Sequence, residues 1–372
     1  MSGRARFALV LAAALVVVST AVAAPHVGGR AYLVVSGSGD TLLQRNADER
    51  VPIASITKLM TVLVTREHAR LDDVVTVQPQ AAEVGESSIY LKRGERLTVR
   101  ELIEAALIQS ANDAAVALAQ YVGHGSIPAF VAMMNAKARQ LGLTETHFAN
   151  PDGLDAAGHY SSARDVTKLA QILMHDAFVR SVVRQRVAHI TGRTLHTWND
   201  LLATFPGLIG VKTGHTDKAG WSEVAAAQGR GVTIYATLLG EPSRSVRNAD
   251  LAQLLAWGLA QYRVVPIVSA RRVYATASVP WGKRPLRLVA SKEIVRVARL
   301  GRPLTERVVT PTVVSLPVRA GDRLGEVRVY DRGKLVARAP LVADRTISRP
   351  GMLGRVGWYA ERTLDHIGGW FS

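Results

Sequence analysis

A serine and a lysine stand three residues apart within residues 52–60, where apolar residues recur at helical spacing. This spacing predicts a helix that begins near Ser55 and carries the Ser55 hydroxyl and the Lys58 amine on one face. A serine hydroxyl becomes a good nucleophile when a neighbouring base removes its proton, and a lysine amine can be that base when burial lowers its pKa. Backbone N–H groups at the helix N-terminus could receive a developing oxyanion. The pair indicates nucleophilic serine chemistry, although this spacing alone is common on surface helices.

Two later segments support the same chemistry. Ser110 and Asn112 follow an amphipathic segment, and Lys212-Thr213-Gly214 ends a short apolar run at 208–211 that is typical of a strand. The elements S-x-x-K, S-x-N and K-T-G, in this order, are the shared signature of penicillin-binding proteins and class A β-lactamases. The combination is far more specific than any of the three alone.

The elements that must position these residues are strands at both ends of a region with helices between them. A capping box from Thr98 to Glu101 predicts a helix through Leu107, which leaves Ser110 and Asn112 in a loop. The order indicates an α+β fold in which a mostly antiparallel sheet carries a helical subdomain. Strands are expected at 30–36, near 42–43, and at 209–213, 220–227 and 232–239, and further helices at 113–121, 128–141, 162–174 and 247–261.

The pattern changes after Tyr262. Short β-patterned runs separated by Gly and Pro predict a small all-β domain, a β-sandwich, without a catalytic cluster; they lie at 264–268, 271–277, 286–290, 294–299, 308–318 and 324–329. From Pro350 onward the apolar residues return to helical spacing and aromatic residues stand near the chain end. We expect an amphipathic helix that lies in a membrane interface, with a helix packed on its own domain as the alternative.

The N-terminal residues have the pattern of a secretory signal peptide. Arg4 and Arg6 precede an apolar stretch at 7–18, and Ala21-Val22-Ala23 matches a cleavage site. We favour cleavage over an uncleaved membrane anchor because the apolar run is short for a span. The expected organisation is a signal peptide at 1–24, a serine peptidase domain at 25–262, a β-sandwich at 263–346 and an anchoring helix at 347–372.

Composition limits the partners and the chemistry. The 372 residues include no cysteine, which excludes disulfides and cysteine-based metal sites. The formal charge of +16 favours anionic partners, which for an exported protein are lipid head groups and cell-wall polymer, and nucleic acid is not expected. His147, His159 and His196 show no metal-ligand spacing, so we expect structural roles for them and no metal site.

With all its motifs together, the chain resembles the D-alanyl-D-alanine carboxypeptidases among the low-molecular-mass penicillin-binding proteins. The likeness covers essentially the whole chain after the leader and includes the three triplets, residues 94–99, 150–154, 159–169 and 212–220, the C-terminal β-domain and the tail that ends Trp370-Phe371-Ser372. The resemblance implies a penicillin-binding/β-lactamase-like fold. It also implies removal of the terminal D-alanine of peptidoglycan stem peptides, inhibition by β-lactams, and no metal or organic cofactor. The expected location is the outer, periplasmic face of the bacterial cytoplasmic membrane, held there peripherally.

The resemblance also implies roles for individual residues. Ser55 is the acylating nucleophile, Lys58 its base, and Ser110 helps to pass a proton to the departing D-alanine. Asn112 hydrogen-bonds the substrate peptide, Lys212 tunes the local field, and Thr213 binds the terminal carboxylate. The backbone N–H groups of Ser55 and His215 form the oxyanion hole, with Gly214 between His215 and the K-T pair.

Two departures from the family pattern and three alternative functions remain. Ala111 stands where the family commonly has glycine, and residues 197–202 match the family's N-x-N-x-L-L stretch only in part. A class A β-lactamase needs a carboxylate for deacylation in an E-x-x-L-N context, which residues 145–149 do not provide. A D,D-endopeptidase shares the three motifs, and a non-catalytic penicillin-sensing or wall-binding protein could keep the pocket for recognition alone.

Overall fold

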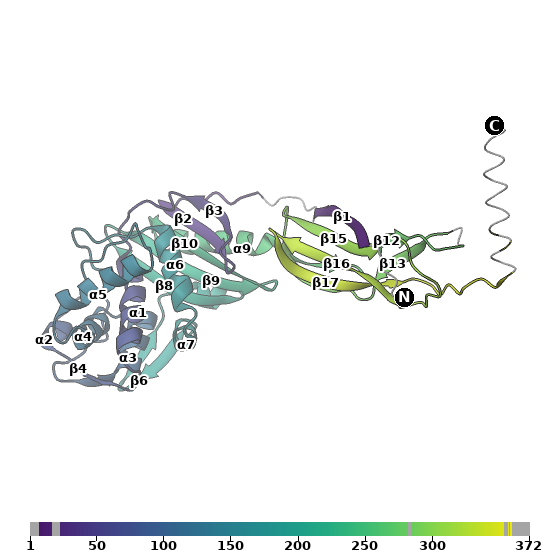
Figure 1. Ribbon diagram of the computed structural model, residues 1–372. Coiled ribbons are helices and arrows are strands. Elements are labelled where there is room, and N and C mark those ends of the chain that lie inside the picture. The colour runs from purple at the N-terminus through teal and green to yellow at the C-terminus, as the bar shows by residue number, and fades with distance from the viewer. Residues whose placement is uncertain (1–6, 17–22, 282–283, 353–355, 357, 359–372) are drawn as a thin grey trace. The chain divides into compact units, whose positions relative to one another are not determined.

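The computed structural model describes residues 7–16, 23–281, 284–352, 356 and 358 (Figure 1). The chain divides into two compact units, Val22–Gln261 and a second unit formed by Tyr262–Ser372 together with Met1–Ala21. Separate clusters of buried apolar side chains form the core of each unit. The residues predicted to do chemistry all lie in the unit Val22–Gln261, which we call the catalytic unit.

A five-stranded antiparallel sheet forms the centre of the catalytic unit. Its strand order is β3 (Thr41–Arg45), β2 (Ala31–Ser36), β10 (Val232–Glu241), β9 (Gly220–Gly229) and β8 (Leu208–Thr216). Side chains alternate across the sheet, so that Ile234 meets α9 (Arg244–Ala260) at Gly258 while Thr237 contacts Thr167 of α6 (Ala163–Leu173). The two helices therefore cover opposite faces of the sheet. In the strand order, β8 is one of the two edge strands.

The remaining helices gather beside this sheet (Figure 1). A 3₁₀ turn at Ala54–Thr57 leads into α1 (Lys58–His68), which packs on α4, α5 and α6. The other helices of this unit are α2 (Pro79–Ala82), α3 (Val99–Glu104), a π-helical turn at Ala105–Gln109, α4 (Asn112–Val122), α5 (Ile127–Gln140), α7 (Ala177–Val183) and α8 (Leu201–Thr204). It also contains an antiparallel pair, β4 (Val74–Thr76) with β5 (Arg96–Thr98), and a hairpin of β6 (Val187–Ile190) and β7 (Arg193–His196). The mixed α/β class predicted from the sequence is confirmed.

The second unit is built almost entirely of strands. Its six-stranded antiparallel sheet has the order β1 (Phe7–Val16), β15 (Pro303–Pro311), β16 (Arg323–Asp331), β17 (Lys334–Ala343), β13 (Leu286–Ala290) and β12 (Val273–Ala277). A two-stranded sheet of β11 (Tyr262–Val268) and β14 (Ile294–Arg299) packs on β16 and β17 and encloses an apolar core. Residues 7–16, part of the expected signal peptide, are placed as edge strand β1 beside β15.

Several details differ from the sequence predictions or lie beyond them. The Thr98–Glu101 capping box is confirmed, but α9 begins at Arg244 because Ser243 caps it, three residues before the predicted start. Hairpin β6–β7 and strand β17 were not predicted. Most of the expected amphipathic helix at 347–372 lies outside the described residues. Within the described part of the chain, no single helix is both long enough and apolar enough to span a membrane. α4 and α5 meet these length and hydropathy requirements only when taken together, and the pair is bent by 89°.

Candidate active site

Ser55 and Lys58 meet at the junction between the 3₁₀ turn and α1. The Lys58 Nζ atom lies 2.7 Å from the Ser55 Oγ atom, as the three-residue spacing predicts. Ala54, just before the serine, has a φ of +49°, a backbone conformation that L-residues rarely adopt. Such strain is held only where the surroundings enforce it, and here it presents Ser55 at the start of the helix.

Lys58 is fully buried and satisfied by three acceptors. Its Nζ atom donates to Ser55 Oγ, to Asn112 Oδ1 at 2.7 Å and to the backbone oxygen of Asp152 at 2.6 Å. Burial lowers the pKa of Lys58 to about 8, against the opposing influence of Asp152, Asp113 and Glu86. An amine with this pKa is partly neutral near physiological pH and can accept the Ser55 proton.

The turn at 150–153 supplies the carbonyl that holds Lys58. Gly153 has a φ of +90°, and a Cβ atom there would lie 2.0 Å from the backbone oxygen of Ala54. Asn150 Oδ1 accepts from the Gly153 N–H at 2.8 Å, and Thr61 Oγ1 donates to the Pro151 oxygen at 2.5 Å. The turn therefore packs directly on the Ser55 segment, a role that the sequence analysis did not assign to it.

Ser110 follows the π-helical turn in the predicted loop, whereas Asn112 is the first residue of α4 rather than a loop residue. Ser110 has a φ of +64°, and its Oγ atom accepts from Lys212 Nζ at 2.8 Å. Asn112 donates from Nδ2 to the Gly85 oxygen at 3.0 Å while its Oδ1 atom holds Lys58. Asp113 is buried and accepts from Ser88 Oγ and the N–H groups of residues 89 and 91, so it fixes the loop beside the site.

Edge strand β8 brings Lys212, Thr213, Gly214 and His215 to the same place. Lys212 is buried, and desolvation together with nearby Lys58 lowers its pKa well below the usual value. A Cβ atom on Gly214 would lie 2.8 Å from the Ile53 oxygen, so glycine is required for β8 to approach the Ser55 segment. His215 stacks on Trp221 with ring centroids 4.0 Å apart.

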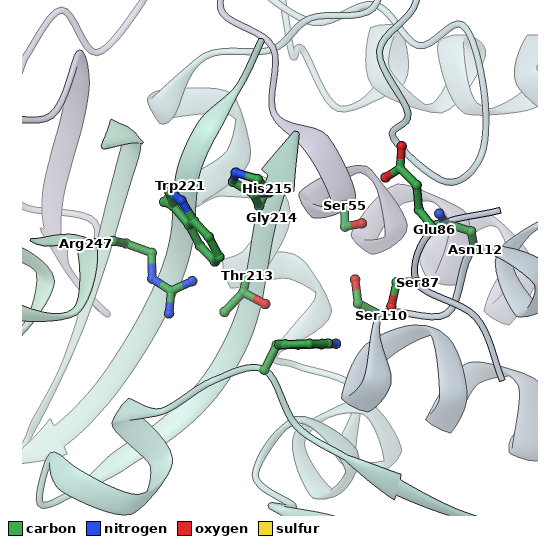
Figure 2. Close-up of a pocket in the computed structure, with 11 residues that line it drawn as sticks. Ser55, Glu86, Ser87, Ser110, Asn112, Thr213, Gly214, His215, Trp221 and Arg247 are labelled. Atoms are coloured by element: carbon green, nitrogen blue, oxygen red, sulfur yellow. The ribbon is translucent and has the colours of Figure 1, made fainter. Parts of the chain in front are cut away.

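A cleft of about 200 Å³ lies between these segments, and of the predicted site residues Ser55, Ser110, Asn112, Thr213, Gly214 and His215 line it (Figure 2). The hydroxyl groups of Ser55, Ser110 and Thr213 point into one space, with β8 on one side and Asn112 on the other. The lining residues that the sequence analysis missed are Glu86, Ser87, Trp198, Trp221 and Arg247. Trp198 lies in the partly matching stretch 197–202, and the position of Trp221 beside the K-T-G strand follows from the β8–β9 register.

Arg247 places a buried cation at one end of the cleft. Its side chain is 1% exposed, and its Nη2 atom donates to Asn248 Oδ1 at 2.6 Å. Burial lowers the pKa of Arg247, although nearby Glu223 and Asp200 raise it. A buried guanidinium at the lining of the cleft, on the side of Thr213, can attract and hold a carboxylate.

His159 is buried in a structural position. Its Nδ1 atom accepts from the Ala149 N–H at 3.1 Å, so Nε2 carries the proton and donates to Thr57 Oγ1 at 2.7 Å. Burial lowers its pKa to about 4, which keeps the ring neutral at physiological pH. Among the residues that the structure describes, no three His, Cys, Asp or Glu side chains gather in a way that could hold a metal ion.

Comparison with known proteins places this cleft in a family. The family described as D-alanyl-D-alanine carboxypeptidase matches residues 18–243. The chain is 31% identical to D-alanyl-D-alanine carboxypeptidase DacF of Bacillus subtilis over 88% of each chain. The structure is similar to that of D-alanyl-D-alanine carboxypeptidase DacD from Francisella tularensis, with a TM-score of 0.64 and 25% identity over 89% of this chain and 97% of the other. It is also similar to the Streptomyces K15 DD-transpeptidase, with a TM-score of 0.62 and 32% identity over 64% of this chain and 100% of the other.

Proposed function

The chain belongs to the D-alanyl-D-alanine carboxypeptidase family of serine peptidases, and from this premise we propose that it removes the terminal D-alanine of peptidoglycan stem peptides through an acyl-enzyme on Ser55. The observation that carries the assignment to these residues is the 2.7 Å contact between Ser55 Oγ and the buried Lys58 amine. Neither group would be reactive alone, since a free serine hydroxyl is a weak nucleophile and a free lysine amine is protonated.

In the acylation step, the neutral Lys58 amine takes the proton of Ser55 as Oγ attacks the carbonyl carbon of the penultimate D-alanine. The charge that develops on the carbonyl oxygen is received by the backbone N–H groups of Ser55 and His215. The close approach of β8 at Gly214 supports this placement. Asn112 binds the substrate peptide with its amide group and holds Lys58 in line.

In the departure step, the C–N bond breaks and the leaving amine takes up a proton. Ser110 is suited to deliver it because its Oγ atom is in contact with Lys212 Nζ at 2.8 Å, which gives a route from a lysine to the cleft. D-Alanine then leaves with the proton that Ser110 delivered from Lys212. Water attacks the ester, its proton passes through Ser110 back to Lys212, and Lys58 returns to Ser55 Oγ the proton that it took during acylation. This step restores Ser55, so no cofactor is needed.

Recognition of the free carboxylate falls to Thr213 and Arg247. Thr213 points into the cleft, and Arg247 supplies a buried positive charge at its lining (Figure 2). The carboxylate of a terminal residue directly after the scissile bond satisfies this charge, whereas a chain that continues through the α-carboxyl of that residue has an uncharged amide at this point. The arrangement favours a carboxypeptidase over an endopeptidase. β-Lactams carry a carboxylate and a strained amide, so they fit the same cleft and acylate Ser55.

The location of the enzyme is a further part of the proposal. Residues 1–24 would direct export and be removed, and the tail would rest on the outer face of the cytoplasmic membrane through its apolar stripe. Deletion of residues 351–372 should release the protein from membranes and leave its activity on soluble peptide unchanged. Membrane fractionation would test this, and an unchanged membrane-bound share would contradict the anchoring role.

The activity itself is tested by D-alanine release from a synthetic peptide that ends in D-Ala-D-Ala. We expect release by the wild type, none by Ser55→Ala, and loss of release after treatment with penicillin. A well-folded wild type that binds penicillin covalently but releases no D-alanine would instead favour an endopeptidase or a penicillin sensor.

A further inference from the structure

Glu223 is a buried carboxyl group next to the cleft that the proposed reaction does not use. It lies on β9 with 0% of its side chain exposed, directly opposite Thr213 in the β8–β9 register. Cross-strand partners project to the same face of a sheet, as do residues two apart on one strand. Thr213, Glu223 and Trp221 therefore share the face against which α9 packs, and two of the three line the cleft.

Arg247 is the charged group that faces Glu223 across this layer. Its Nε atom lies 3.3 Å from Glu223 Oε2, and its guanidinium carbon lies 5.8 Å from the centre of the Trp221 ring. On the outer side, Asn248 Oδ1 accepts from Arg247, and Asp200 lies 3.9 Å from Nη2. Asp200 itself is held by two bonds from Arg244 and one from Asn248, so Glu223 is the inner partner of the guanidinium.

The pKa of the Glu223 carboxyl group depends on its burial and on the charged groups around it. Burial raises the pKa of Glu223 to about 7, although Arg247 and Lys212 lower it; nearby Asp200 adds to the rise. Within the described residues neither Glu223 oxygen has a hydrogen bond of good geometry, although Asn199 lies close enough to lower the pKa of the carboxyl group, and the contact with Arg247 is electrostatic. A buried carboxyl group without good hydrogen bonds costs folding free energy. Its interaction with the Arg247 charge offsets part of this cost.

We propose that Glu223 is a positioning residue, whose buried carboxylate holds the Arg247 guanidinium beside Thr213 for recognition of the substrate's terminal carboxylate. The inference rests on the proposed function, since it concerns how the same cleft selects a substrate with a free C-terminus. Glu223 touches no reacting atom and acts through Arg247. Its effect therefore belongs to binding of the charged end rather than to proton transfer at Ser55.

The test is a double-mutant cycle with Glu223→Gln, Arg247→Gln and both together, measured on a peptide that ends in D-Ala-D-Ala. We expect Glu223→Gln to raise KM about tenfold with a much smaller change in kcat, as for the loss of one partner of a buried charge pair. The double variant should be no worse than Arg247→Gln alone, because Glu223 works only through that side chain. Glu223→Asp, which keeps the charge, should recover part of the loss.

Two controls separate positioning from general stability. Glu241 is also buried, with a pKa that burial raises to about 7, but it lies on β10 and does not line the cleft. Glu241→Gln should leave KM unchanged. The wild-type pH profile of kcat/KM should show a titration near pH 7 that is absent from the profile of Glu223→Gln. Both profiles should show the rise toward pH 8 that is caused by deprotonation of Lys58.

Strictly additive losses in the cycle, or a KM that Glu223→Gln leaves unchanged, would overturn the positioning role. If Glu223→Gln melts at a much lower temperature, two other results distinguish a positioning role from a purely structural one. A purely structural role predicts neither recovery of KM in Glu223→Asp nor a titration near pH 7 in the wild-type profile of kcat/KM. Failure of the proposed function would look different: the wild type would then release no D-alanine, whatever stands at position 223.

Discussion

At the scale of single residues, the proposed chemistry depends on a lysine whose pKa burial lowers, so that a neutral amine is available near pH 8. The pKa of Lys58 is lowered to about 8, so below that pH the protonated amine predominates and cannot accept the Ser55 proton. We expect the rate of Ser55 acylation by a fluorescent penicillin to rise about tenfold per pH unit up to about pH 8 and then to level off. The measurement is the acylation rate from pH 6 to pH 9, with melting temperature recorded at each pH.

Lys58→Arg is the matched control for this pH profile. Arginine keeps its positive charge over the whole range and cannot act as the base, so its acylation should be negligible at every pH. A wild-type rate that is flat across pH 6 to 8, in protein that stays folded, would show that Lys58 does not take the proton.

The sequence predicted the residues to which the proposed chemistry is assigned, but not the side chains that surround them. Ser55, Lys58, Ser110 and Lys212 stand in short motifs, and the structure joins them in two direct contacts, Ser55 with Lys58 and Ser110 with Lys212. Arg247, which lines the cleft, and Glu223, which lies behind it, could not be found in this way, because only the pairing of β8 with β9 and the packing of α9 bring them to this place. Such register-dependent neighbours leave no local spacing in the sequence.

At the scale of elements, the turn at 150–153 and the Ser55 segment form one packed unit. A Cβ atom on Gly153 would lie 2.0 Å from the Ala54 oxygen, so Gly153→Ala must displace the segment that presents the nucleophile. We expect a loss of stability of about 3 kcal/mol or more and a fall in acylation of at least tenfold. Urea unfolding and the acylation rate are the two measurements.

Gly39→Ala is a matched control because Gly39 has a φ of +88°, close to the +90° of Gly153, but has open space at the position of a Cβ atom. It should cost only the backbone strain, about 1 kcal/mol, and leave acylation unchanged. Equal effects of the two substitutions would show that backbone strain, rather than contact with Ala54, determines the result.

The strength of the local sequence pattern determines which helices and strands the sequence could predict. Helices with a capping box or a strong apolar stripe, such as α3 and α6, were expected close to their observed bounds. Hairpin β6–β7 was missed because its four-residue strands are too short for an alternating pattern to stand out. Strand β17 was also missed, although its ten residues pair with both β16 and β13.

At the scale of the whole molecule, each unit has its own core, and the catalytic unit holds every residue that lines the cleft. α9 completes this unit by covering one face of its sheet, and it ends at Ala260, two residues before the other unit begins at Tyr262. The Streptomyces K15 DD-transpeptidase is matched over its full length by 64% of this chain, which indicates that a unit of this kind can stand without a β-domain.

We therefore expect the fragment 23–261 to fold cooperatively and to release D-alanine from soluble peptide with a kcat/KM within a few-fold of the full chain. The physical reason is that removal of the second unit takes no strand from the five-stranded sheet and no side chain from the cleft. Thermal unfolding followed by circular dichroism, together with the peptide assay, tests both parts. A fragment shortened further to 23–243, which lacks α9 and Arg247, is the control and should lose both folding and activity. Should 23–261 fold yet be inactive, the β-domain would have to contribute to catalysis, and the assignment of the whole reaction to one cleft would be wrong.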